Sequence, residues 1–268
     1  MIADMLSYGF MQRALLAAVM IGTLCSVVAF FVVLKRLSFL GVGIAHTAMG
    51  GIAIGLVTGL NPFWCGSAFA VAAALATGDI SRRGRLHEDT VIGIFFAAGM
   101  AFGIALLSSF KGYYPEIFSL LFGNILSVSE AELRLLAVVM AIVLLFIGLF
   151  FKELLAISFD EEAALAGGLP VSPLYFGLLT AMALTVMVSV KLVGIVLASA
   201  LLVIPAATGY RLSRNYRTMF LLSLLTGIGG SVGGLILSYF LDLPSGAAIV
   251  LFMALLFLIS LLYRPRTA

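Results

Sequence analysis

Charged residues are scarce in this sequence: Asp, Glu, Lys and Arg make up 10% of its 268 residues, against about 25% in an ordinary soluble domain. Hydrophobic residues make up 63%, and the mean hydropathy is +1.24. No polar segment is long enough to build a separate water-soluble core. This composition argues against a built-in ATPase or ligand-binding domain and predicts one membrane domain over residues 1–268. Any energy source must then come from another chain or from an ion gradient.

Cysteine and the common catalytic motifs are also lacking. Cys25 and Cys65 lie in apolar surroundings without CxxC spacing, which is typical of packing residues. The sequence has no GxxxxGK[ST] phosphate loop, no HExxH, no GxSxG and no paired carboxylates within an apolar run. Nucleotide hydrolysis, membrane proteolysis and proton relays depend on such groups. We therefore expect that this chain alone is not an enzyme.

Long apolar runs are abundant. About 20 apolar residues are enough to cross the hydrocarbon core of a bilayer. The runs lie at about residues 10–34, 38–60, 62–79, 90–109, 132–151, 173–190, 192–208, 218–240 and 245–263. They predict an all-α, polytopic bundle of nine transmembrane helices. Eight spans are the alternative, because only the Val190-Lys191 region separates the sixth run from the seventh and the run after Gly59 is short.

Basic residues cluster at five places between these runs. The clusters are Lys35-Arg36, Arg82-Arg83-Arg85, Lys152, Arg211-Arg214-Arg217 and Arg264-Arg266. With nine spans every cluster falls on one side of the membrane, which the positive-inside rule identifies as the cytoplasm. The sequence therefore predicts an outer N-terminus and an inner C-terminus.

Glycines recur every four residues in two of the runs, at Gly51, Gly55 and Gly59 and in the pairs Gly229/Gly233 and Gly230/Gly234. This spacing places the glycines of each set on one helix face, where neighbouring backbones can approach closely. The spacing predicts tight packing within a helical bundle.

His46 is the histidine that lies inside an apolar run. At 1.5 Å per residue it lies roughly 12 Å into the second predicted span. An ionisable group at that depth is costly and tends to face a pathway or a partner, and neutral imidazole binds zinc, manganese or iron. Gly50 shares its helix face and leaves room beside the ring. Two interpretations stay open: a place on a transport pathway, or a hydrogen bond to a neighbouring helix.

The segment SFDEEAALAGGLPV at 158–171 lies outside the apolar runs. Ser158 and Glu161 have the spacing of a capping box, acidic residues suit the N-terminal end of a helix, and a glycine pair beginning at Gly167 would end it. The pattern predicts a short cytoplasmic helix at about 158–168. Its acidic start and compact apolar body would fit a groove on a soluble partner; a connecting helix without a partner is the alternative.

Residues 115–128, on the predicted outer side, form an apolar stretch too short to cross the membrane. They are typical of a surface or re-entrant helix. Ser127 with Glu130, or Ser129 with Glu132, would cap the span that follows.

Two outer acidic residues, Glu116 and Asp242, are weaker candidates for docking an external partner or admitting a cation. The alternative is that both are solvated loop charges. On the cytoplasmic side, His87, Glu88 and Asp89 could suggest a metal site by composition, but helix capping by the two acids explains them better.

Six segments of the sequence form a set: they are RLSFLGVGIAHTAMGGIA at 36–53, EDTVIGIFFAAGMAFGIALLS at 88–108, LFGNILSVS at 121–129, SFDEEAALAGGLPV at 158–171, KLVGIVLASALLVIPAAT at 191–208 and DLPSGAAIVL at 242–251. In this order they resemble the zinc/manganese/iron permease family of ABC importers. Together they are spread over most of the chain. Any one of them would be a weak signal, but their shared order is specific.

The resemblance implies the permease subunit of an ATP-driven importer for a divalent transition metal, zinc or manganese, in the inner (plasma) membrane of a prokaryote. It implies a homodimer in the lipid bilayer, a separate cytoplasmic ABC ATPase, an extracytoplasmic metal-binding protein and no nucleic acid. It implies no permanent cofactor, only the transported metal. It assigns ATPase coupling to the short helix, at Phe159, Asp160, Glu161, Ala164, Leu165 and Gly167.

One position departs from the family pattern. Many members carry an aspartate four residues before the histidine of the second helix, and here that residue is Val42. The resemblance thus implies His46 as a metal ligand without its carboxylate partner, so that either other ligands take part or the metal binds only transiently. Zinc accepts fewer and softer ligands than manganese, which tilts the expectation slightly toward zinc.

Three other functions compete with this interpretation. A secondary metal transporter would need no ATPase, but acidic residues would be expected inside its spans. A membrane-embedded enzyme would need more than His46. A siderophore or cobalamin permease would be expected to be longer, with a wider cavity.

Overall fold

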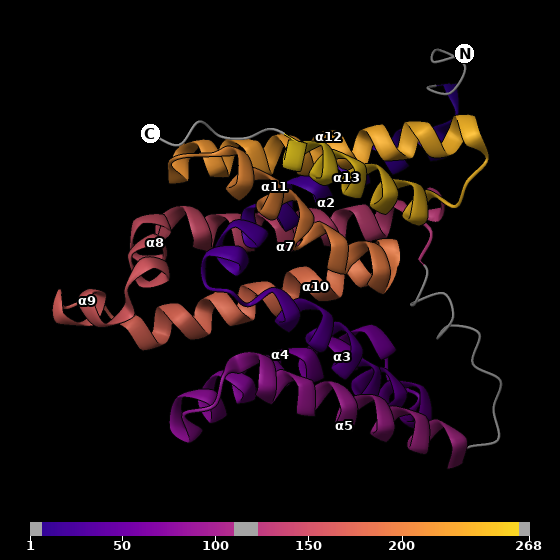
Figure 1. Cartoon of the computed structure of the whole chain (residues 1–268). Coiled ribbons are helices and arrows are strands. Elements are labelled where there is room, and N and C mark those ends of the chain that lie inside the picture. The colour runs from indigo at the N-terminus through magenta and orange to yellow at the C-terminus, as the bar shows by residue number, and fades with distance from the viewer. Residues whose placement is uncertain (1–6, 110–122, 263–268) are drawn as a thin grey trace. The chain divides into compact units, whose positions relative to one another are not determined.

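The structure is a computed structural model that describes residues 7–109 and 123–262 (Figure 1). In these two ranges all regular structure is helical, which confirms the predicted all-α class. The helices are α2 (Gly9–Leu34), α3 (Ser38–Thr58), α4 (Pro62–Gly84), α5 (Glu88–Ser109), η1 (Ile125–Ser127, a 3-10 turn), α7 (Glu130–Leu149), α8 (Phe151–Phe159), α9 (Glu161–Ala166), α10 (Val171–Leu201), α11 (Ile204–Leu212), α12 (Tyr216–Leu241) and α13 (Ser245–Leu262).

Eight helical stretches of the described residues are long and apolar enough to cross a membrane. One of them, Val171–Leu212, has 42 residues, or about 63 Å at 1.5 Å per residue, twice the thickness of the hydrocarbon core. The helix is broken at Gly194, where φ is 81° and ψ is 167°, a conformation open essentially to glycine alone. This stretch corresponds to the sixth and seventh predicted spans, and the break comes three residues after Lys191.

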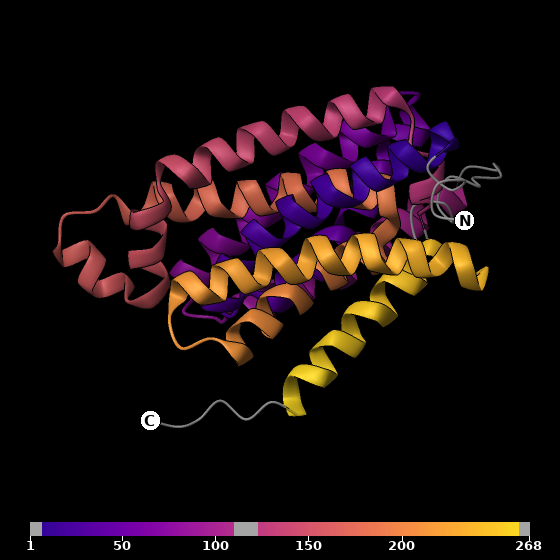
Figure 2. The same cartoon turned by 90° about the horizontal axis from the view of Figure 1, so that it is seen from above.

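The chain divides into two compact units: Met1–Val33 with Phe118–Leu144 and Val188–Ala268, and Leu34–Ile117 with Leu145–Met187. In the first unit, the α2 glycine Gly22 lies against α12, where an added Cβ would be 2.7 Å from the Gly227 oxygen. The Ser223 hydroxyl donates to the Ser26 carbonyl across the same contact, at 3.3 Å. Helix α13 runs beside α12 and diverges from it in the view from above (Figure 2).

In the second unit, α3 packs on both α4 and α5. A Cβ at Gly55 would lie 2.7 Å from Pro62 Cα, and one at Gly99 would lie 2.8 Å from Thr47 Cα. The close packing predicted for the spaced glycines is confirmed at Gly51, Gly55, Gly230, Gly233 and Gly234, where a Cβ would meet a neighbouring helix, but not at Gly59 and Gly229, where it would meet nothing within 4 Å. The consequence for function is that α3, which carries His46, is held between two neighbours at backbone contact distance.

Candidate metal histidine and the α9 anchor

His46 lies half-buried in the middle of α3. Its ring Nδ1 is 2.9 Å from the carbonyl oxygen of Val42. A carbonyl oxygen can only accept, so Nδ1 carries the proton and the lone pair of the neutral ring lies on Nε2. The partner is in the same helix, not in a neighbouring one as one of the two interpretations of the sequence required. The backbone of α3 thus orients the imidazole with Nε2 as the nitrogen able to bind a metal.

The surroundings of His46 are aromatic. The Phe96 ring of α5 lies 4.8 Å from the imidazole, centroid to centroid. The space beside Gly50, which the sequence left open for a substrate or a bulky partner, is occupied by bulky side chains, because a Cβ there would lie 3.3 Å from both Phe69 and Phe102. Among the residues that the structure describes, no three His, Cys, Asp or Glu side chains gather as a metal site. His46 is therefore a single imidazole in an apolar setting.

The short helix predicted at 158–168 is present as α9, but its N-cap differs from the prediction. The Asp160 carboxylate accepts a hydrogen bond from the Ala163 N–H at 2.9 Å. Helix α8 continues to Phe159, and the Ser158 hydroxyl is used within it, donating to the Leu154 carbonyl at 2.6 Å. The predicted capping box of Ser158 with Glu161 is therefore wrong, because Ser158 belongs to the preceding helix.

The two faces of α9 differ in exposure. Ala164 is buried, whereas the apolar side chains of Leu165 and of Phe159, just before the helix, are 65% and 66% exposed. Gly167 ends the helix, and its N–H donates to the Ala163 carbonyl at 2.9 Å. Two large apolar side chains are thus exposed around this six-residue helix.

Glu161, the first residue of α9, is held by two cations. Its Oε2 accepts from Lys35 Nζ at 2.9 Å, and its Oε1 accepts from Arg82 at the end of α4. Both cations lie over the ring of Tyr175 on α10, with Lys35 Nζ 5.1 Å and Arg82 Cζ 4.1 Å from its centroid. The Tyr175 hydroxyl donates to Glu88 Oε1, on the first residue of α5, at 3.1 Å. We call these five residues the α9 anchor.

The sequence did not predict this cluster. Lys35 and Arg82 were interpreted only as topogenic charges, and Glu88 only as a helix cap. The acidic start of α5 is present as expected, with Glu88 and Asp89 in its first turn. The one available signal was that charges of both signs stand at the ends of several apolar runs.

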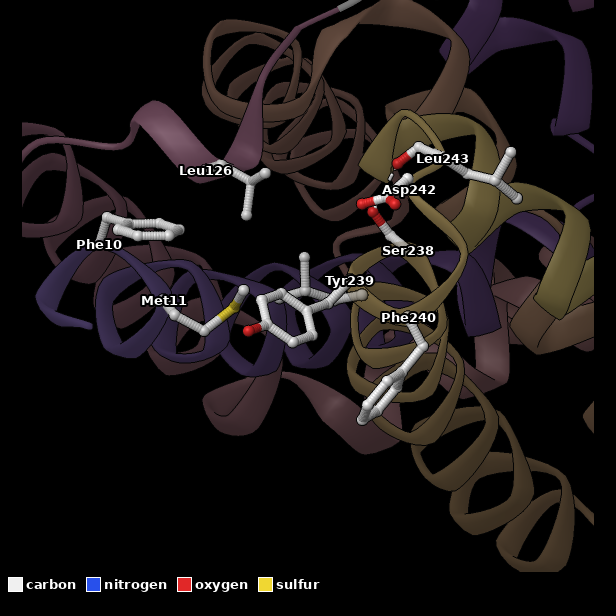
Figure 3. A pocket seen from close by; sticks show the side chains of 9 residues that line it. Phe10, Met11, Leu126, Ser238, Tyr239, Phe240, Asp242 and Leu243 are labelled. Atoms are coloured by element: carbon white, nitrogen blue, oxygen red, sulfur yellow. Dashed lines mark hydrogen bonds between the residues drawn. The ribbon is translucent and has the colours of Figure 1, made fainter. Parts of the chain in front are cut away.

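Asp242 lies at the turn between α12 and α13 in a left-handed conformation, with φ of 50°. It borders a cavity of about 610 Å³ (Figure 3). The cavity is lined by the α2 start, η1 and the end of α12, through Phe10, Met11, Leu126, Leu235, Ser238, Tyr239, Phe240, Asp242 and Leu243. The Ser238 hydroxyl is used locally, donating to the Leu243 carbonyl at 2.7 Å. The side chains of Tyr239 and Asp242 therefore supply its other side-chain oxygens.

Of the remaining outer predictions, Glu116 and most of residues 115–128 lie outside the described residues. Ser129 and Glu132 form the capping box of α7: Glu132 Oε2 accepts from the Ser129 N–H at 3.0 Å, and the Ser129 hydroxyl accepts from the Glu132 N–H at 3.3 Å. This pair, and not Ser127 with Glu130, is the correct one of the two alternatives.

Residues 7–264 match the protein family described as "ABC 3 transport family". An uncharacterized membrane protein of Synechocystis sp. is 40% identical over 259 residues, which are 97% of this chain and 92% of that protein. The manganese transport system membrane protein MntC of Listeria innocua is 36% identical, with 98% and 93% of the two chains covered. The solved structure of PsaBC from Streptococcus pneumoniae in complex with Fab is similar with a TM-score of 0.86 and 34% identity, covering 99% and 97% of the chains.

Proposed function

The chain belongs to the ABC 3 transport family, and on that premise we propose that it is the membrane-spanning permease subunit of an ATP-driven importer for a divalent transition metal ion. The similarity to MntC over nearly the whole of both chains supports this assignment. It also supports manganese over zinc as the metal to test first, because the ligand argument from Val42 gave zinc only a slight preference.

The orientation of His46 is the observation that carries the proposal. Its Nδ1 proton is held by the Val42 carbonyl, so the lone pair on Nε2 is available to a passing cation. A single imidazole binds a divalent ion weakly, which suits a transport step in which the ion must also leave. Val42 offers no carboxylate, so further ligands would be water, backbone carbonyls or a second copy of the chain.

We propose one partner protein on each side of the membrane. A cytoplasmic ABC ATPase would seat on α9 through the exposed Phe159 and Leu165 side chains, and would carry all of the ATP hydrolysis. An extracytoplasmic metal-binding protein would dock near Asp242, whose cavity has room for a side chain of a partner. Two copies of the chain would form the working permease, with both compact units contributing to one domain over residues 1–268.

The mechanism that fits these parts is alternating access. ATP binding and hydrolysis on the partner would shift α9, and the helices packed with it would move between outward- and inward-open arrangements. His46, held on α3 between α4 and α5, would hand the ion from one side to the other. In this proposal the chain itself supplies the route for the ion and the helix that couples to the ATPase, and it carries out no covalent reaction.

The test is metal uptake into proteoliposomes that contain the chain with its ATPase, the metal-binding protein and ATP. We expect ATP-dependent manganese uptake that falls at least about tenfold in His46→Ala, because a weak site loses a ligand of roughly 1.4 kcal/mol or more. His87→Ala is the matched control, since His87 is exposed and outside the membrane-crossing part of α5, and it should transport like the wild type.

The result also separates the competing functions. Uptake that proceeds without the ATPase would identify a secondary transporter. Uptake of a metal chelate in preference to the free ion would identify a siderophore-type permease. Equal uptake by His46→Ala and wild type would remove His46 from the pathway while leaving the transporter class intact.

A further inference from the structure

Within the proposed function, we infer that Glu161 is a positioning residue that transmits the movement of α9 to α3 and α4, and does not itself bind the ATPase. The inference rests on the geometry of the α9 anchor, which joins the short helix to the ends of helices far away in the sequence.

The carboxylate of Glu161 is turned toward two cations, and its side chain is 42% exposed. Both of its oxygens already accept from cations of the same compact unit, Oε2 from Lys35 and Oε1 from Arg82. The large apolar side chains around α9 are those of Phe159 and Leu165, both of them exposed. A partner that docks on α9 therefore meets these two side chains, and to engage the Glu161 carboxylate it would have to compete with two ion pairs.

The two cations that bind Glu161 lie next to α3 and within α4, the helices that the proposal expects to move. Lys35 lies between α2 and α3, three residues before Ser38 begins the helix that carries His46, and its side chain is only 10% exposed. Arg82 lies in the last turn of α4, which packs along α3. A displacement of α9 thus acts on α3 and α4 through a single side chain.

Tyr175 packs against both cations of the α9 anchor and holds them in place. Its ring is 1% exposed and lies beneath both cations, and its hydroxyl is bonded to Glu88 at the start of α5. On α4, a Cβ at Gly78 would lie 2.6 Å from Leu179 of α10, so α4 and α10 are in close contact there. Two carboxylates balance the two cations, and the low exposure of the Lys35 side chain, 10%, strengthens its charge-assisted bond with Glu161.

Breaking one pair has a specific consequence. Removing the Glu161 charge leaves Lys35 with little access to water and without this counter-ion, while α9 keeps its own N-cap from Asp160. The short helix would still form and still dock. It would no longer be tied to α3 and α4, so ATP hydrolysis would continue without moving the metal path.

The experiment compares Glu161→Gln with Glu162→Gln, a neighbour with the same charge change but an exposed side chain. Each variant is co-expressed with the ATPase and metal-binding protein, and co-purification, ATP hydrolysis and manganese uptake are measured in the same proteoliposomes. We expect Glu161→Gln to keep the ATPase bound and to raise the ATP hydrolysed per ion transported by at least about fivefold, the lower end of common allosteric couplings. Glu162→Gln should keep the wild-type ratio.

A double-mutant cycle tests the link itself. Lys35→Gln should also uncouple, and the double variant should be no worse than Glu161→Gln alone, because Glu161→Gln already removes the ion pair with Lys35. An unchanged ratio of ATP to metal in Glu161→Gln would overturn the inference, as would loss of the ATPase on purification, which would make Glu161 a docking residue. Absence of ATP-dependent uptake in the wild type would instead contradict the proposed function.

Discussion

The Nδ1 of His46 donates to the carbonyl oxygen of Val42, one helical turn earlier, at 2.9 Å. Val42 has no carboxylate side chain, yet it orients the imidazole through its backbone. Because this bond involves no side-chain atom of residue 42, the ring orientation can survive substitution there. On the proposed metal pathway, a substitution at residue 42 would change the ligand set without disturbing the histidine.

Restoring the carboxylate should strengthen metal binding. In Val42→Asp the new side chain lies on the same face of α3 as His46 and adds a hard oxygen ligand, which manganese favours more than zinc does. We expect manganese to compete about tenfold better against zinc in uptake assays, a difference of roughly 1.4 kcal/mol. Val42→Asn is the control, because it has nearly the same shape without the charge. A variant that binds neither metal better would show that residue 42 does not face the ion.

Mutagenesis can show whether Asp160 or Ser158 is the N-cap of α9. Asp160→Ala removes the acceptor for the Ala163 N–H and should destabilise α9 by about 1 kcal/mol. Faster hydrogen exchange at residues 161–166 and weaker retention of the ATPase would report the loss. Ser158→Ala should leave both unchanged, because the Ser158 hydroxyl bonds within α8. If Ser158→Ala loosens α9 instead, the N-cap assignment is wrong.

Membrane topology distinguishes nine spans from eight. If Val171–Leu212 crosses twice, around the break at Gly194, Asp242 and α9 lie on opposite sides of the membrane; if it crosses once, they lie on the same side. Single cysteines at Glu162→Cys and Asp242→Cys, in a chain with Cys65→Ser, would be labelled with an impermeant maleimide in intact cells. Cys25 is fully buried and should not react.

We expect labelling of Asp242→Cys from outside, and labelling of Glu162→Cys only after the cells are opened. Protection of both residues in intact cells, with labelling after lysis, would support eight spans and would put the cavity beside Asp242 on the cytoplasmic side. The basic clusters that follow α11 would then lie outside, against the positive-inside rule.

Much of this protein could be predicted from its residues alone. Composition and the length of the apolar runs determined an all-helical membrane chain, because in a bilayer helices satisfy their own backbone groups. The charges at the ends of the runs predicted an orientation, and the segment at 158–168 predicted a short helix, although its N-cap is Asp160 and not the predicted Ser158. The order of six segments predicted the family that the comparison confirmed.

Only the tertiary structure decided which groups meet. Lys35, Arg82, Glu88, Glu161 and Tyr175 come from separate helix ends and form one cluster because α3, α4, α5 and the part of α10 up to Met187 belong to one packed unit. In the sequence, a cation at the end of an apolar run has the same form whether it meets water, a lipid headgroup or a carboxylate. Which of these it meets depends on helix packing between residues that are 79 to 126 positions apart in the sequence, and no local pattern encodes that.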